Sequence, residues 1–128
     1  MPKLYTIAEA DALLPELTTL LEDLQAQAAI LAHAQNEFRE VRKQVQTDGH
    51  GGRMDSLTGQ ATTAEQRVRT HLARLQELDI ELKDVQTGLI DFYHEREGRI
   101  VYLCWKLDEP SVGYWHDLDA GFAGRQPL

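Results

Sequence analysis

The sequence predicts an α+β fold, in which a long antiparallel helical hairpin is followed by a small antiparallel β-sheet at the C-terminus. Residues 1–79 place apolar side chains at alternating three- and four-residue steps, which is the spacing of one face of a helix. From Ile80 the periodicity changes, and residues 80–128 contain short runs of β-branched and aromatic residues, which favour strands. A chain of 128 residues is expected to form a single domain with its own hydrophobic core.

The first helix is expected to start at Thr6, because Thr6 and Glu9 have the spacing of a capping box. Pro15 interrupts the helical pattern, and a proline there must either kink the helix or begin a new one at its first turn. We expect a short leading turn and then a long helix from about Pro15 to Val45. Its apolar residues follow a heptad pattern typical of a coiled coil, at Ala10, Leu13, Leu17, Leu20, Leu24, Leu31, Ala34, Phe38, Val41 and Val45.

The helical series ends at a glycine-rich stretch, with three glycines in residues 49–52. Glycine is costly inside a helix, so residues 47–56 are predicted to form a loop that acts as a solvated linker. His50, Arg53 and Asp55 of this loop are alternative ligand contacts.

A second apolar stripe predicts a helix that ends near Asp79. The stripe consists of Leu57, Ala61, Ala64, Val68, His71, Leu72, Leu75 and Leu78. We expect His71 to be a hydrogen-bonded histidine at the helix interface, and His33, which lies outside the first stripe, to be exposed. A hairpin of two helices cannot cover its apolar seam on every side. It must therefore pack on the C-terminal third or on a second copy, and we expect a homodimer.

Two strands are predicted at Leu89–His94 and Arg99–Leu107, separated by Glu97 and Gly98. A two-residue turn at this pair sets Asp91 opposite Cys104. A bulge at the glycine shifts the register by one residue and places Asp91 among apolar side chains. Glu-Gly is not the favoured Asn-Gly turn sequence, so we favour the bulge.

The remainder of the C-terminal region, after Pro110, predicts less regular structure. Val112–Trp115 is expected to be a third short strand, so that residues 80–128 form a β-meander followed by an irregular tail at residues 119–128.

The composition excludes several classes of partner. The net charge is −8 and no basic patch is visible, which argues against nucleic acid and against an anionic membrane surface. One cysteine, Cys104, rules out an intramolecular disulfide and a cysteine-rich zinc site. The N-terminus lacks a signal pattern and no apolar run spans a membrane, so we expect a cytoplasmic protein.

The candidate site lies in the aromatic-rich C-terminal stretch. Its candidate ligand-binding residues are Asp91, Glu109, Trp115, His116, Asp119 and Arg125. An arginine in a glycine-rich tail can fold over an anionic ligand, or can tie the tail to Asp91 or Asp119, which we favour. No cofactor is expected. The alternative is a divalent metal such as zinc or manganese bound by His116, Asp119 and Glu109.

Catalysis has three candidate residues, Asp91, Cys104 and His116. In a metal-assisted enzyme Asp91 would act as acid or base. In a thiol enzyme Cys104 would be the nucleophile, with His116 as base and Asp91 or Asp119 orienting it. Cysteines in the middle of a strand are more often inert core residues, and we expect no enzyme.

Nearly the whole chain resembles a bacterial family, domain of unknown function 2203. The resemblance rests on the segments Thr6–Leu17, Leu82–Asp84, Gly88–Phe92, Leu103–Trp105, Glu109–Pro110, Tyr114–His116 and Gly121–Pro127. It implies a small bacterial protein and brings no established activity or catalytic residues. We therefore expect a dimeric binding or interaction module, with a site for a small ligand or a protein partner near the C-terminal sheet.

Overall fold

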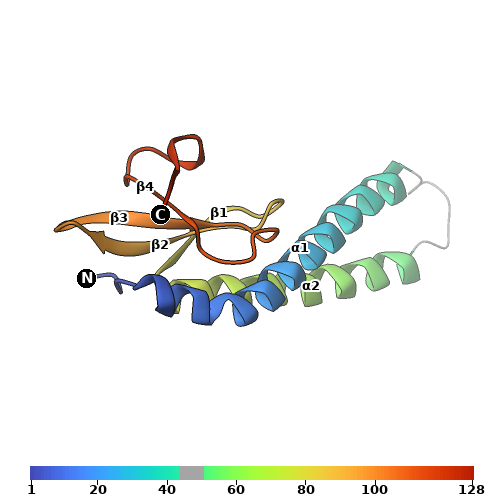
Figure 1. Cartoon of the computed structure of the whole chain (residues 1–128). Coiled ribbons are helices and arrows are strands. Elements are labelled where there is room, and N and C mark those ends of the chain that lie inside the picture. The colour runs from blue at the N-terminus through green and yellow to red at the C-terminus, as the bar shows by residue number, and fades with distance from the viewer. Residues whose placement is uncertain (44–50) are drawn as a thin grey trace.

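The structure is a computed structural model that describes residues 1–43 and 51–128, and it confirms the predicted α+β fold (Figure 1). Two helices precede a five-stranded antiparallel sheet whose strands are ordered β1-β2-β3-β4-β5, a meander. The elements are α1 (Ile7–Lys43), α2 (Gly51–Glu77), β1 (Ile80–Asp84), β2 (Leu89–Arg96), β3 (Arg99–Trp105), β4 (Tyr114–His116), the 3-10 helix η1 (Phe122–Gly124) and β5 (Gln126–Pro127).

The N-terminus of α1 has the predicted capping box. The backbone N–H of Thr6 donates to Glu9 Oε1 at 2.9 Å, and the N–H of Glu9 donates to Thr6 Oγ1 at 3.1 Å. The predicted break at Pro15 is wrong, because α1 continues through it as one helix. Pro15 is exposed, whereas Leu14 and Leu17 on the inner face are buried, so core packing holds the helix together on both sides of the proline.

The predicted loop 47–56 is too long at its C-terminal end. Helix α2 already begins at Gly51, so Arg53 and Asp55 are helical. Arg53 forms an ion pair with Glu37 of α1. This contact links the start of α2 to α1 and offsets the low helix propensity of the glycines there. Val45, His50 and the first part of the predicted loop lie outside the described residues.

The helical hairpin packs against one face of the sheet along only part of its length (Figure 1). The core there joins both helices to β1–β4, and its buried residues include Leu17, Leu21, Leu24, Leu75, Ile90, Phe92, Val101, Leu103, Trp105 and Trp115. The sheet therefore covers the seam near the N-terminus of α1. The hairpin continues beyond the sheet as two helices alone (Figure 1). The buried helical residues Ala34, Val41, Leu57 and Ala64 are not part of the core that joins helices and sheet.

The β2–β3 hairpin has the two-residue turn, and the favoured bulge is wrong. Arg96 pairs with Arg99, and Asp91 pairs with Cys104. Glu97 and Gly98 both have positive φ, 53° and 77°. This is the backbone of a type I′ turn, whose twist matches that of the strands, so Glu97 adopts a conformation that side chains usually avoid.

Two strands of the sheet, β1 and β5, were not predicted from the sequence. Strand β1 pairs with β2, with Glu81 opposite Asp91. The predicted irregular tail contains η1 and ends in β5, which pairs with β4 through Tyr114 and Pro127. The tail crosses the sheet on the side away from the helices (Figure 1), so both faces of the central strands are covered. No helix in the described ranges is long and apolar enough to cross a membrane.

Candidate functional site

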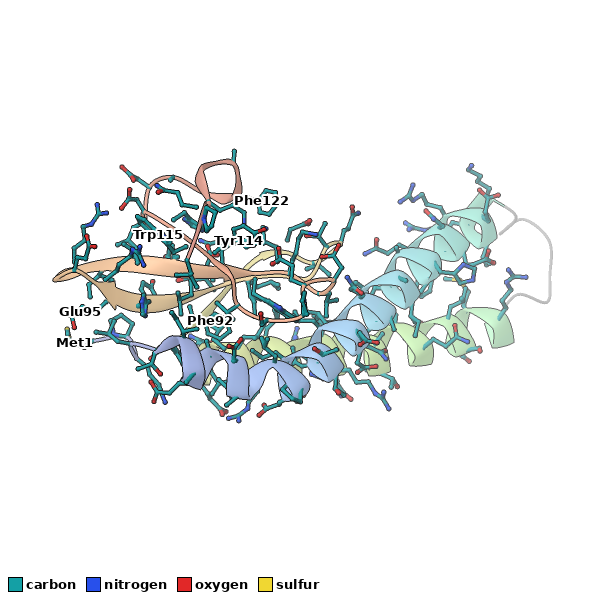
Figure 2. The ribbon with its side chains drawn as sticks, in the orientation of Figure 1. Met1, Phe92, Glu95, Tyr114, Trp115 and Phe122 are labelled. Atoms are coloured by element: carbon teal, nitrogen blue, oxygen red, sulfur yellow. The ribbon has the colours of Figure 1, made fainter. Side chains whose placement is uncertain are left out.

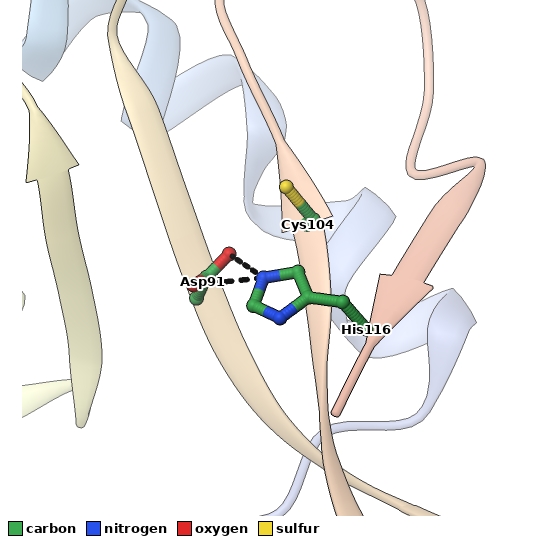
Figure 3. A group of neighbouring side chains, drawn as sticks. All are labelled: Asp91, Cys104 and His116. Atoms are coloured by element: carbon green, nitrogen blue, oxygen red, sulfur yellow. Dashed lines mark hydrogen bonds and ion pairs between the residues drawn. The ribbon is translucent and has the colours of Figure 1, made fainter. Parts of the chain in front are cut away.

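Three candidate catalytic residues meet on the tail-covered face of the sheet. Asp91 of β2 lies directly opposite Cys104 of β3. His116 of β4 pairs with Tyr102, two residues from Cys104, so alternation along β3 places His116 and Cys104 on the same face. Figure 3 shows the three side chains, from three neighbouring strands, close together, with the Asp91 carboxyl facing the His116 ring. They are 1%, 0% and 2% exposed, respectively.

Both ring nitrogens of His116 make hydrogen bonds. Nδ1 lies 2.8 Å from the carbonyl oxygen of Asp117, which can only accept, so Nδ1 donates a proton to it. Nε2 lies 3.2 Å and 3.1 Å from the two carboxylate oxygens of Asp91. Two bare acceptors cannot hydrogen-bond, so one proton lies between Nε2 and the carboxyl group. The Asp91–His116 pair is therefore neutral overall, whichever partner holds that proton.

Burial governs the acid–base properties of the other two groups. Desolvation raises the pKa of Asp91 above its usual range, against the opposing charge and hydrogen bond of His116. Burial and the nearby charge of Asp91 raise the pKa of the Cys104 thiol to about 12. The thiol is therefore protonated at neutral pH and is a poor nucleophile. His116 has no ring nitrogen left to serve it as base, so the arrangement does not fit a thiol enzyme.

A small cavity of about 160 Å³ opens onto the Asp91–His116 pair. Its remaining lining residues are Lys83, Leu89, Tyr102, Leu118, Gly121 and Phe122. Gly121 and Phe122 belong to the tail and Leu118 directly precedes it, so this part of the chain forms one wall of the cavity. Lys83 lies at the rim, with Nζ 5.1 Å from the centre of the Tyr102 ring.

A second group anchors the tail beside this cavity. The Arg125 guanidinium donates to Glu109 Oε1 at 2.8 Å and stacks on the rings of Tyr114 and Phe122, at 3.8 Å and 4.7 Å from their centres. It also reaches the backbone carbonyl of Cys104 at 3.4 Å. Arg125 thus ties the tail to the sheet as expected, although its partner is Glu109 and not Asp91 or Asp119. Figure 2 shows Tyr114 and Phe122 on the tail side and Phe92 on the helix side.

The other predicted site residues lie elsewhere. Trp115 belongs to the core on the opposite face from His116, with the Arg96 guanidinium 4.6 Å from its ring centre. Asp119 is exposed in the tail. Within the described residues, the predicted metal ligands His116, Asp119 and Glu109 do not form a cluster, since the single group with ligand spacing is Asp91, Cys104 and His116.

Sequence reasoning missed Lys83, Tyr102 and Phe122 as parts of the site. Lys83 lies on β1, which was not predicted. Its signal is the period of two within Ile80–Asp84, which places the apolar residues Ile80 and Leu82 on one face and Lys83 on the other.

Comparison with known proteins gives a family and no activity. The model of domain of unknown function 2203 (DUF2203), described as an uncharacterized conserved protein, matches residues 3–128. No curated protein and no solved structure matches the chain. Since the matched range is essentially the whole chain, the chain belongs to DUF2203, a family of uncharacterized conserved proteins.

Proposed function

We propose that this protein binds a small anionic molecule, a carboxylate in the simplest case, in the cavity over the Asp91–His116 pair. The observation that carries the proposal is the charge of that cavity. The Asp91–His116 pair is neutral overall and the nearby Cys104 thiol is protonated, so the ammonium of Lys83 is the charge carried by the residues that line the cavity. Glu81, which pairs with Asp91 from β1, accepts a hydrogen bond from Tyr93 and does not line the cavity. A small cavity whose lining carries one positive charge favours an anion.

The size of the cavity limits the ligand. At about 160 Å³ it is well below the roughly 300–1,000 Å³ of sites for drug-sized molecules. Leu89, Leu118 and Phe122 supply apolar walls, while Lys83 at the rim supplies the charged contact. The ligand that fits is a small metabolite with one charged end and a short apolar part.

Binding suits this geometry better than acid–base catalysis. A catalytic histidine uses one ring nitrogen for its orienting partner and keeps the other for the substrate. Both nitrogens of His116 are engaged within the protein, so the ring is a fixed part of the cavity floor.

The test compares two probes of similar size and different charge, acetate and acetamide, at constant ionic strength. We expect acetate to bind with millimolar affinity, as suits a ligand of four heavy atoms, and to shift the NMR signals of Lys83, Tyr102 and Gly121. Acetamide should bind far more weakly. Lys83→Gln should weaken acetate binding about tenfold, since a charge-assisted contact is lost.

The matched control is Lys43→Gln, which removes the same charge at the far end of α1, where Lys43 pairs with Glu40. It should leave acetate binding unchanged. Equal shifts with acetate and acetamide, or an equal effect of the two lysine substitutions, would refute the proposal.

The proposal includes a homodimer through the part of the hairpin beyond the sheet. Two packed helices cover each other on one side only. A groove of about 670 Å³ on this part is lined by Ala29, Ile30 and Ala64 among others, and Ile30 is 40% exposed. A second copy of the hairpin would place the same apolar groove on the other side of the interface, as two-fold symmetry requires.

A further inference from the structure

We propose that Asp91, Cys104 and His116 bind one divalent transition-metal ion, with zinc the best match, and that the cavity supplies the fourth coordination position. The three donor atoms lie within 4.8 Å of one another, and they form the one such group in the part of the chain that the structure describes. No other set of histidine, cysteine and acidic side chains there has ligand spacing.

The donor types select the class of metal. A thiolate, an imidazole and a carboxylate together suit zinc and related transition metals, whereas magnesium and calcium prefer oxygen ligands alone. Three protein ligands with one open position is the pattern of zinc sites that bind an exchangeable ligand, while purely structural sites have four protein ligands.

The distances require little rearrangement. From usual zinc–ligand bond lengths, donor atoms around a tetrahedral ion are about 3.3–3.6 Å apart. His116 Nε2 and the nearer Asp91 oxygen are already 3.1 Å apart, and the remaining separations are no more than 4.8 Å. Closing the set around an ion takes side-chain shifts of roughly 1 Å, on three strands whose backbones are fixed by the sheet.

The hydrogen bond from His116 Nδ1 to the carbonyl of Asp117 is the second observation that favours a metal. Metal-binding histidines generally donate their other N–H to a carbonyl or carboxylate, which fixes the tautomer and the ring orientation. Here Nδ1 holds its proton at 2.8 Å from that carbonyl, so Nε2 is the nitrogen that faces Asp91 and Cys104. Binding of an ion would release two protons to solvent, the one that Nε2 and Asp91 share and the one on the Cys104 thiol, which ligates as a thiolate.

The position of the cavity accounts for the open coordination site. It is lined by Asp91 and His116, so a water molecule or the anionic end of a ligand entering it reaches the proposed ion directly. The metal inference rests on the proposed function only for the identity of the fourth ligand, which would be the bound carboxylate. Metal binding by the three side chains does not itself require a carboxylate.

The test is metal binding by the full chain after removal of metal with a chelator. We expect one zinc ion per chain, with nanomolar or tighter affinity in competition with a chromophoric chelator. Asp91→Asn and His116→Gln should weaken this affinity at least about 100-fold, more than the loss of an outer partner costs. Cobalt bound in place of zinc should show a sulfur-to-cobalt charge-transfer band, and Cys104→Ala should abolish that band.

The chain offers a matched control in a second Asp–His pair. His71 Nε2 lies 2.7 Å from Asp23 Oδ2 on the helical hairpin, where no thiol is nearby. His71→Gln should leave zinc affinity and the cobalt spectrum unchanged. If Asp91→Asn or His116→Gln fails to fold, Cys104→Ala decides the question, because alanine is small enough for that buried position.

Three results would overturn the inference. These are no zinc binding at micromolar concentration, a cobalt spectrum without the thiolate band, and equal loss of affinity in His71→Gln. Acetate binding to the metal-free protein, and its dependence on Lys83, is measured separately. Failure of the metal site would therefore leave the anion proposal standing, and failure of acetate binding would leave the metal result intact.

Discussion

At the scale of single residues, Arg125 shows how burial decides the value of an ion pair. Its side chain is 11% exposed and that of Glu109 is 15% exposed, and the arginine also stacks on two rings. We expect Arg125→Ala to lower the free energy of unfolding by about 3 kcal/mol, because Glu109 would be left largely buried without its counter-charge. Urea denaturation measures this change.

The matched control for Arg125 is Arg74, which pairs with Glu16 at 2.7 Å but is 42% exposed. Water screens that pair, so Arg74→Ala should cost much less stability. An equal loss in both variants would contradict the argument from burial. A double-mutant cycle with Glu109→Gln separates the Arg125–Glu109 interaction from the loss of ring stacking.

At the scale of elements, the β2–β3 turn sets the register that builds the site. Glu97 has a φ of 53°, in the left-handed region that asparagine and glycine tolerate far better. We expect Glu97→Asn to raise the free energy of unfolding by about 1 kcal/mol, since Asn-Gly is the favoured type I′ pair. Glu95→Asn, on an exposed position of β2, should lower stability slightly, because asparagine disfavours strands. A loss of stability in Glu97→Asn would contradict the turn assignment.

The elements also show what the sequence could and could not predict. The helices were predictable because capping and apolar spacing are local signals, and Thr6, Glu9 and the apolar stripe carry them directly. The continuity of α1 through Pro15 and the start of α2 at Gly51 were not predictable from the sequence. Tertiary contacts, namely core packing beside Pro15 and the Arg53–Glu37 ion pair, outweighed the local helix propensities there.

The site was predictable in its residue types but not in its geometry. The sequence singled out Asp91, Cys104 and His116 and also offered Asp119 and Glu109 as partners, with nothing local to choose between them. That choice depends on the β2–β3 register and on the pairing of β4 with β3, which are contacts between residues far apart in the chain. Lys83 was missed because β1 has only five residues and no strong strand signal.

At the scale of the whole molecule, the proposed dimer makes a prediction about assembly. We expect the wild-type protein to be a dimer at tens of micromolar by native mass spectrometry. Ile30→Glu should give a monomer, because it places a charge in the apolar groove of the hairpin. Ile7→Glu is the matched control, since Ile7 is 37% exposed and lies at the other end of α1. A wild-type monomer at that concentration would contradict the dimer.

The division of the hairpin into a part under the sheet and a part beyond it also has a consequence for local opening (Figure 1). The middle of β2 and β3 is buried between helices and tail, so we expect the backbone amides there to exchange with solvent only when the whole fold opens. The outer part of each helix packs against one neighbouring helix only. Its backbone amides should therefore become exposed through a local opening that costs less free energy than global unfolding. Hydrogen exchange should therefore show two levels of protection, a higher one in the sheet and a lower one in the outer part of the hairpin. A partner bound to the outer part would raise the lower level without touching the cavity.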